Sequence, residues 1–166
     1  PPNFYGETKL AAEKIVQATP LDWAIVRTVL VYGIAQDLSR SNLMLWVKRS
    51  LAANKAIRVV NDQWRTATLV EDLAIGCWLI VQKQAKGLFH ICGKDLMTPY
   101  QMALATAHHF NLDQSLISPT NAQAFVEIGK RPPKTGLAIE KARKLLAFEP
   151  RSFEEGLREL KRQLSE

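Results

Sequence analysis

Residues 5–13 read YGETKLAAE, and the interpretation of the whole chain depends on this stretch. Its composition favours a helix that begins near Asn3 and ends before Pro20. Tyr5 and Lys9 are four residues apart, so on a helix they lie on one face, one turn from each other. A lysine ammonium at that position favours the phenolate form of a tyrosine, which suits the tyrosine to proton transfer.

Strand-like and helix-like patterns alternate along the rest of the chain. Residues 23–31, WAIVRTVLV, form an apolar run that predicts one strand buried on both faces of a parallel sheet. Residues 70–81 predict a mostly buried helix, and residues 87–92, GLFHIC, predict a second strand. This alternation predicts an α/β fold. Further helices are predicted at 41–53, at 98–110 and from Ser152, both of the latter with capping boxes, and at 139–146; short strands are predicted at 57–60 and 116–119.

Composition and charge exclude several classes of protein. With 166 residues, 47% hydrophobic and 23% charged, the chain is long and apolar enough for one globular core. No apolar run approaches the roughly 18 residues of a membrane helix, so we expect a cytoplasmic protein. The net charge of +6 is spread over scattered Lys and Arg residues, which argues against a nucleic-acid surface. Part of that charge also suits an acidic ligand such as a diphosphate.

Cysteines and histidines do not form a recognisable site. Cys77 and Cys92 lie in apolar stretches and are expected to be buried, reduced thiols. His90, His108 and His109 have no third ligand at zinc-like spacing, so we predict no metal site. His90, in an apolar strand, is expected to be a core histidine with its hydrogen bonds satisfied.

Several motifs together resemble one protein family. Residues 2–9, PNFYGETK, followed by Ala12-Glu13, closely resemble the catalytic helix of the extended short-chain dehydrogenase/reductases, within the NAD-dependent epimerase/dehydratase superfamily. The resemblance covers nearly the whole chain. Its further motifs are Arg27-Thr28, Val31-Tyr32-Gly33, residues 62–68 (DQWRTAT), Val70-Glu71-Asp72, residues 87–90 (GLFH), Thr98, Arg131-Pro132, Phe148-Glu149-Pro150 and Glu155-Gly156-Leu157.

The resemblance implies a catalytic pair and a cofactor. Tyr5 would give a proton to the carbonyl oxygen of the substrate, while Lys9 assists it and hydrogen-bonds the ribose of NADP(H) or NAD(H). Thr28 and Val29 would approach the nicotinamide carboxamide, where a parallel strand ends at a ligand crevice. For Thr28 and Val29, ordinary strand packing is the alternative.

Substrate contacts are implied for residues nearer the C-terminus. Arg65 is a candidate anchor for a substrate diphosphate, because a guanidinium fork matches phosphate oxygens, although surface ion pairing would also explain it. Trp64 could stack on a sugar or base or serve as a packing anchor. Arg131, by resemblance, faces the nucleotide end of the substrate, with a domain-border ion pair as the alternative.

Within the family, the chain is most similar to the dTDP-4-dehydrorhamnose reductases, which reduce a nucleotide-linked 4-keto sugar. It departs from that branch at Leu30, where an aromatic residue is usual, and at residues 65–67, where Gly-x-Pro is usual. An arginine at position 65 resembles the sugar epimerases and dehydratases, which therefore remain an alternative. A second alternative is a non-catalytic regulatory subunit, like the methionine adenosyltransferase beta subunit of the same superfamily.

Two parts of such an enzyme are missing from the sequence. The chain has no glycine-rich turn for a cofactor pyrophosphate, and the catalytic Ser or Thr of the family precedes the tyrosine. We therefore expect the C-terminal half of a Rossmann-type enzyme, inactive alone and with weak or no NAD(P)H binding. Residues 1–36 and 57–92 are assigned to the end of the parallel sheet. Residues 37–56 and 93–166 are assigned mainly to a small substrate-binding subdomain; a homodimer stays open.

Overall fold

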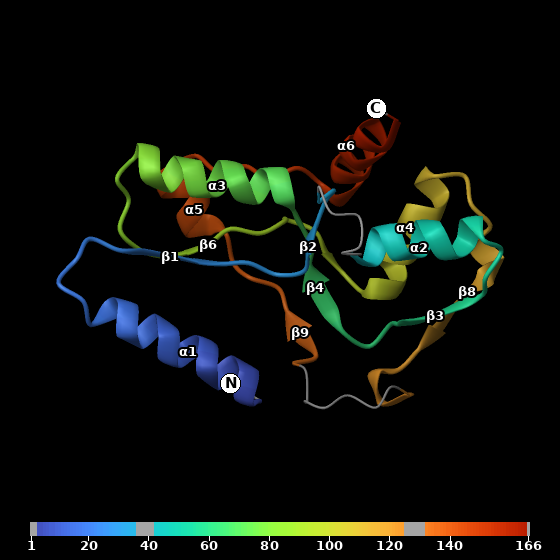
Figure 1. Ribbon diagram of the computed structural model, residues 1–166, viewed down its shortest axis with the longest axis horizontal. Helices are drawn as coiled ribbons and strands as arrows, with labels where there is room; N and C mark the ends of the chain where they lie inside the picture. Colours follow the sequence, from blue (N-terminus) through green and yellow to red (C-terminus); the bar gives the residue numbers. More distant parts are fainter. Residues whose placement is uncertain (1–2, 36–41, 125–131, 166) are drawn as a thin grey trace.

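The computed structural model describes residues 3–35, 42–124 and 132–165. It has mixed α/β architecture, which confirms the predicted fold class (Figure 1). The helices are α1 (Phe4–Gln17), α2 (Leu43–Ala52), α3 (Val70–Gln82), α4 (Pro99–His109), α5 (Glu140–Leu146) and α6 (Phe153–Ser165), with short 3-10 turns at Gln114–Leu116 and Ala122–Ala124. The strands are β1 (Ala24–Arg27), β2 (Val31–Tyr32), β3 (Ile57–Val60), β4 (Trp64–Thr66), β5 (Thr68–Leu69), β6 (Gly87–His90), β7 (Leu96–Met97), β8 (Ile117–Thr120) and β9 (Lys134–Thr135).

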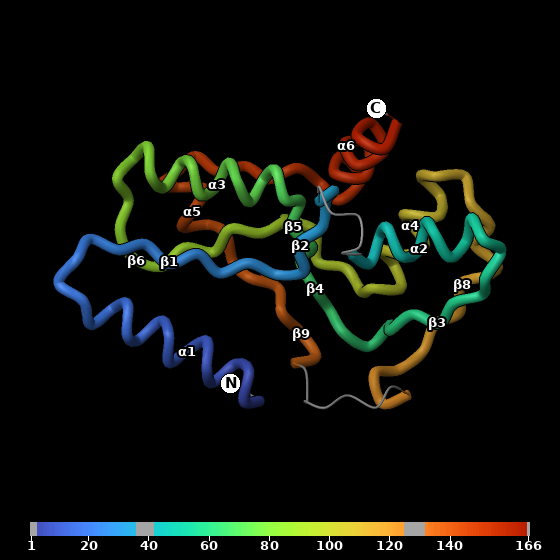
Figure 2. Tube along the Cα trace, in the orientation of Figure 1, coloured from blue at the N-terminus to red at the C-terminus, as the bar shows by residue number. Residues whose placement is uncertain are grey.

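One side of the molecule is built on the parallel pair β1 and β6, with Ala24 opposite Gly87 and Arg27 opposite His90. Helix α1 lies on one face of this pair, and α3 with α5 lies on the other (Figures 1 and 2). The core between the strands and α3 and α5 consists of Ile80, Phe89, Ile91, Ala142, Leu146 and Phe148. One face of the strands is therefore covered by a buried core under α3 and α5, whereas the other face lies toward α1, which has no buried residues.

The other side is built on the parallel pair β3 and β8, packed against α2 and α4. Its core consists of Val47, Leu51, Ile57, Val59, Ala103, Ala107 and Ile117. Strand β4 lies between the two sides, antiparallel to β7 and parallel to β9. The predicted division into two sequence parts remains a prediction; in space, β3 pairs with β8, and α5 packs against β6.

The apolar run at residues 23–31 does not form one strand, so that prediction was wrong. The chain breaks after Arg27, and Leu30 adopts the left-handed conformation with φ of 44°. The amide of Thr68 donates a hydrogen bond to the Leu30 carbonyl oxygen at 3.2 Å. Strand β2 then pairs with β5 and not with β6. The run is apolar because it serves two separate sheets, and none of the residues of β1 is fully buried.

Helix α3 has the predicted position but not the predicted burial. Only Asp72, Gly76 and Ile80 of this helix are buried, whereas Trp78 and Val81 are exposed. Cys77 lies on the exposed side, which corrects the expectation that both thiols are buried. Cys92 is buried as predicted, and burial raises the pKa of its thiol. Among the described helices, none is both long and apolar enough to cross a membrane.

Two contacts near its first turn help to fix helix α6 to the rest of the molecule. The Asp72 carboxylate of α3 accepts hydrogen bonds from the Arg151 backbone amide, at 2.8 Å, and from the Arg151 guanidinium. The buried Tyr32 ring packs 5.5 Å from the Phe153 ring, and its hydroxyl occupies the space that a side chain at Gly156 would take. Only glycine fits at position 156 in this arrangement.

Candidate active site

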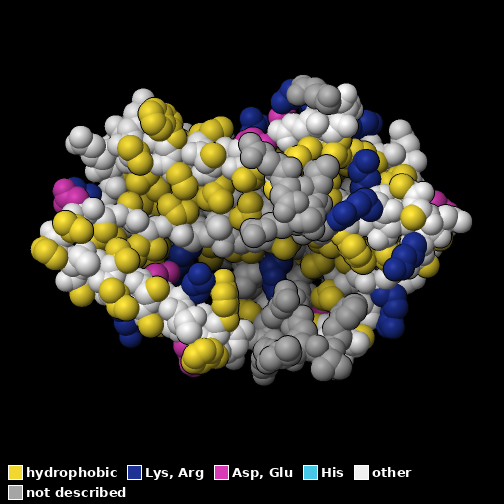
Figure 3. Space-filling model, viewed as in Figure 1, with side chains coloured by type: hydrophobic (Ala, Val, Ile, Leu, Met, Phe, Trp, Pro, Cys, Tyr) yellow, Lys and Arg dark blue, Asp and Glu magenta, His cyan; other side chains and the backbone are white. Residues whose placement is uncertain are grey.

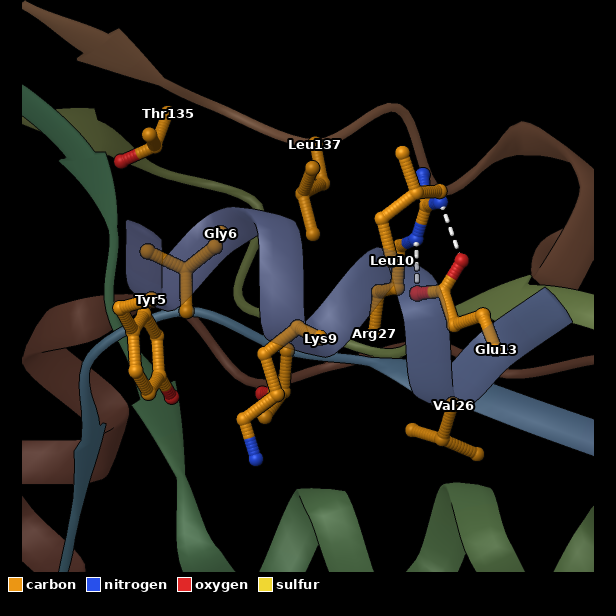
Figure 4. Close-up of a pocket in the computed structure, with 11 residues that line it drawn as sticks. Tyr5, Gly6, Lys9, Leu10, Glu13, Val26, Arg27, Thr135 and Leu137 are labelled. Atoms are coloured by element: carbon orange, nitrogen blue, oxygen red, sulfur yellow. Dashed lines mark hydrogen bonds and ion pairs between the residues drawn. The ribbon is translucent and has the colours of Figure 1, made fainter. Parts of the chain in front are cut away.

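The helix that carries Tyr5 and Lys9 begins at Asn3, whose side chain accepts a hydrogen bond from the Gly6 amide at 2.9 Å. The Lys9 Nζ atom lies 5.5 Å from the centroid of the Tyr5 ring, within the range of a cation–π contact. In Figure 4 the Tyr5 hydroxyl and the Lys9 ammonium lie on the same side of α1. Tyr5 is 70% exposed. Its phenol is therefore accessible for chemistry with a bound molecule.

These two residues lie in an open groove of about 650 Å³ between α1, the end of β1 and the segment after β9 (Figure 4). Thr28 and Val29, the predicted cofactor contacts, line the same groove. The Thr68 hydroxyl holds this segment, donating to the Val29 carbonyl oxygen at 2.7 Å and lying 3.1 Å from the Thr28 hydroxyl. The structure thus brings together Tyr5, Lys9, Thr28 and Val29, which the sequence separates by up to 24 positions.

Groove residues that the sequence interpretation missed include Glu13, Arg27, Thr135 and Leu137. Glu13 accepts two hydrogen bonds from the Arg27 guanidinium, at 2.7 Å and 2.5 Å. This contact lowers the pKa of the Glu13 carboxyl, mainly through the hydrogen bond from Arg27. A signal for Glu13 was present, since it follows Lys9 by one helical turn. The sequence gives no such signal for Thr135 and Leu137, because they are more than 100 residues away from Tyr5 and Lys9 in the chain.

Trp64 and Arg65 lie on β4, outside the lining of the groove. The Arg65 side chain is mostly buried, and its guanidinium donates to the Gln63 side-chain oxygen at 2.6 Å and to the Trp64 carbonyl oxygen at 2.8 Å. Arg65 pairs across the sheet with Thr135, which does line the groove. Trp64 is partly exposed. Arg131 lies outside the described residues, and the roles of all three in substrate binding remain predictions.

The histidines do not line the groove, although His90 lies opposite Arg27 on the paired strand. His90 follows the expected pattern in part: its Nδ1 atom is 3.0 Å from the Ala138 carbonyl oxygen, but its buried Nε2 atom has no partner in the described structure. Within residues 3–35, 42–124 and 132–165, no three His, Cys, Asp or Glu side chains are grouped as a metal site.

Comparison with known families and sequences gives consistent matches. Residues 1–166 match the family described as the RmlD substrate binding domain. The methionine adenosyltransferase 2 subunit beta of Mus musculus is 32% identical over 164 residues, which is 96% of this chain and 49% of that protein. The spore coat polysaccharide biosynthesis protein SpsK of Bacillus subtilis is 26% identical over 161 residues, 96% of this chain and 54% of that protein. The chain spans about half the length of these relatives.

Solved structures match in the same proportion. A dTDP-4-dehydrorhamnose reductase from Clostridium acetobutylicum superposes with a TM-score of 0.89 at 26% identity, covering 100% of this chain and 57% of that protein. The corresponding reductase from Bacillus anthracis, solved in complex with NADP, gives a TM-score of 0.88 at 24% identity over 98% of this chain and 56% of that protein. The fold is therefore that of one half of these larger proteins.

Proposed function

Since the chain belongs to the family of RmlD substrate-binding domains, we propose that it is the catalytic and substrate-binding half of an NAD(P)H-dependent reductase of nucleotide-linked 4-keto sugars. The observation that carries this proposal is the meeting of Tyr5, Lys9, Thr28 and Val29 at one open groove. An exposed phenol beside an ammonium is a suitable proton donor for a ketone oxygen. The likeness to dTDP-4-dehydrorhamnose reductases supports the choice of substrate class.

The groups in the groove fit one end of a nicotinamide cofactor. The Lys9 ammonium offers donors for ribose hydroxyl groups, and the ordered backbone of Thr28 and Val29 offers hydrogen-bonding groups for a carboxamide. When bound, the cofactor would supply the hydride. Tyr5 gives its proton to the substrate oxygen, and Lys9 stabilises the phenolate that is left. No glycine-rich turn for the pyrophosphate occurs in the sequence, so this chain fits the nicotinamide end alone.

The surface around β1 supports the need for a second, cofactor-binding half. Within the described ranges, β1 pairs only with β6, so its other edge is open. Apolar side chains are exposed on both flanking helices: Phe4 and Ile15 on α1, and Trp78 and Val81 on α3. In Figure 3 many hydrophobic side chains gather over this side of the molecule. We propose that further strands and helices of a cofactor-binding half cover it, and that this chain alone binds little NAD(P)H.

Three residues are proposed to bind the substrate. Trp64, partly exposed on β4, would stack on the base or sugar. Arg65 and Arg131 would contact the diphosphate, because a guanidinium fork matches phosphate oxygens. Such an anionic substrate agrees with the net charge of +6, and we place the reaction in the cytoplasm.

A non-catalytic regulatory subunit is the second candidate. It is favoured by the 32% identity to the mouse methionine adenosyltransferase 2 subunit beta, a protein named as a subunit of an enzyme. In that case the groove would bind a nucleotide without turnover, and the function would lie in association with a catalytic subunit.

The test uses the longest natural polypeptide that contains this chain, assayed for NADPH and NADH oxidation with a dTDP-4-keto-6-deoxy sugar. We expect turnover, and we expect Tyr5→Phe to lower kcat by about 10²–10⁴-fold, the usual contribution of a general acid. Tyr100→Phe, a change of the same kind on α4 and outside the groove, should leave the rate unchanged. Absence of turnover in the parent, together with stable binding to a methionine adenosyltransferase catalytic subunit, would establish the second candidate instead.

A further inference from the structure

We propose that Glu13 and Arg27 are positioning residues, whose ion pair sets the place of Tyr5 and Lys9 relative to Thr28 and Val29. The proposal rests on the proposed function, because it concerns the geometry of the same groove. Neither residue takes part in the proton transfer. They act by holding α1, which carries Glu13, against β1, which carries Arg27.

Helix α1 needs such a contact because its packing is weak. None of its described residues is buried, and large apolar side chains such as Phe4 and Ile15 point to solvent. A helix held by a buried apolar face has its position fixed by many contacts. Helix α1 has few such contacts, so a directional polar contact contributes more to fixing its position.

The ion pair is well placed to supply that direction. Both Glu13 carboxylate oxygens accept from the Arg27 guanidinium, at 2.7 Å and 2.5 Å, and this two-point contact fixes orientation as well as distance. The Glu13 side chain is only 15% exposed and that of Arg27 is 42% exposed, so the pair is partly shielded from water. The two residues are 14 positions apart in sequence, so the contact is tertiary.

The positions of Glu13 and Arg27 in their elements explain why loss of their ion pair would change the geometry of the groove. Glu13 is one turn beyond Lys9 on the face of α1 that carries Tyr5. Arg27 is the last residue of β1 and directly precedes Thr28. A shift of α1 against β1 would therefore move the proton donor against the nicotinamide contacts by a similar distance. In Figure 4 the Arg27 guanidinium meets Glu13 away from the Tyr5 hydroxyl, so it does not compete with Lys9 for the phenol.

A second pair in the same molecule serves as a matched control. Arg143 and Glu149 also form a two-point contact, at 2.9 Å and 2.8 Å. The Arg143 side chain is 40% exposed, close to the value for Arg27, and the Glu149 side chain is 59% exposed, well above the value for Glu13. They are six positions apart and join α5 to the segment that follows it. This contact is local, and neither residue lines the groove. Its loss, together with that of the longer Lys94–Glu149 contact at 3.7 Å, therefore removes ion pairing of the same kind without freeing α1.

The first experiment measures amide hydrogen exchange in this chain and needs no activity. In Glu13→Gln we expect exchange of the α1 amides to rise about 5–10-fold, as for a locally opening element, with α5 unchanged. The double variant Glu13→Arg, Arg27→Glu, which restores the pair in reverse, should return α1 to parental exchange. Glu149→Gln should leave α1 as it is. Unchanged α1 exchange in Glu13→Gln, or an equal rise throughout the chain, would overturn the proposal.

The second experiment uses the longest natural polypeptide that contains this chain. Glu13→Gln should lower kcat about 10–100-fold through misplacement of the acid, with KM altered less than about twofold, and the reversed pair should restore kcat. If the parent turns over and Glu13→Gln has parental kcat, the positioning role is wrong while the proposed function stands. If the parent shows no turnover, the proposed function fails, and the exchange experiment alone decides whether the pair positions α1.

Discussion

Two regions of this molecule bury their apolar residues to very different degrees. The packed half, defined as α2, β3, β8 and α4, has a core in which Val47, Ala103 and Ala107 are inaccessible to solvent. The open half, defined as α1, β1, β6 and α3, also contains many large apolar side chains, but Ile15, Trp78 and Val81 on its helices are exposed. Both halves are built from a parallel pair of strands with helices, so the difference lies in what covers them.

The comparison separates stability from function. The apolar surface of the packed half is covered by its own elements and, at Met44 and Met102, lies in a buried cluster with Leu157 of α6. The open half carries Tyr5 and Lys9 on a helix without buried residues, beside a strand with one open edge. Within the described residues, this helix is joined to β1 by the Glu13–Arg27 ion pair.

The largest expected effect compares two isoleucines. Ile57→Ala in the packed half, where Ile57 is 5% exposed, should lower the free energy of unfolding by about 2–5 kcal/mol, because it leaves a cavity. Ile15→Ala in the open half, where Ile15 is 70% exposed, should change it by less than about 0.5 kcal/mol. Urea denaturation of both variants measures this. Equal losses would show that α1 is packed in solution, which would end the distinction between the halves.

An intermediate effect is expected where the open half is fixed to the C-terminal helix. Asp72→Ala removes the buried carboxylate that accepts from the Arg151 amide and guanidinium, and should cost about 1–3 kcal/mol of unfolding free energy. The lower end applies because Arg151 is partly exposed and regains water. Glu149→Gln at a solvent-exposed pair is the control and should be nearly neutral. A neutral Asp72→Ala would mean that α3 and α6 hold together without this contact.

The smallest expected effect is on the pH dependence of stability, which should differ between the two halves. Burial of the His109 ring on α4, and then the charge of Lys161, lower the histidine pKa below its ordinary value of 6.5. The unfolded state then binds the proton first, so stability is complete above pH 6.5 and is lost as pH falls through the lower folded pKa. In the open half, the pKa of Glu13 is lowered below its ordinary value of 4.5, so the stability that its carboxylate contributes is lost only when the pH falls below 4.5.

We therefore expect the melting temperature to fall by less than about 4 °C between pH 7.5 and 5.5, roughly the effect of one such group, and His109→Gln to remove most of that fall. Glu13→Gln should leave this window unchanged. Melting curves followed by circular dichroism at both pH values measure the difference. A fall that is identical in His109→Gln would assign the pH dependence to another group.

Local patterns predicted the fold class and most helix positions, because helix periodicity and caps depend on neighbouring residues. Residues 57–60 are the strand β3 as predicted, and the capping box of Thr98 and Gln101 is formed. The failures occurred where a distant partner decides the structure. The break at Leu30 depends on Thr68, and the short strands β4, β7 and β9 depend on one another.

Burial was harder to predict than secondary structure. Apolarity predicted a buried helix at residues 70–81, yet it cannot distinguish a surface covered by the same chain from one that awaits another protein. In the candidate site, Tyr5 and Lys9 were predicted from their spacing together with the family resemblance, and Thr28 and Val29 from the resemblance alone. Thr135 and Leu137 could not, because only the folded chain brings the segment after β9 beside α1.

The contact between Tyr32 and Gly156 has a consequence for how this family can vary. The hydroxyl of the buried tyrosine takes the space of any side chain at position 156. A mutation of the glycine alone would force the ring out, and shortening the tyrosine alone would leave a void beside the helix. Neither residue can be exchanged first without loss, so the two positions should change together in descendant sequences or stay as they are.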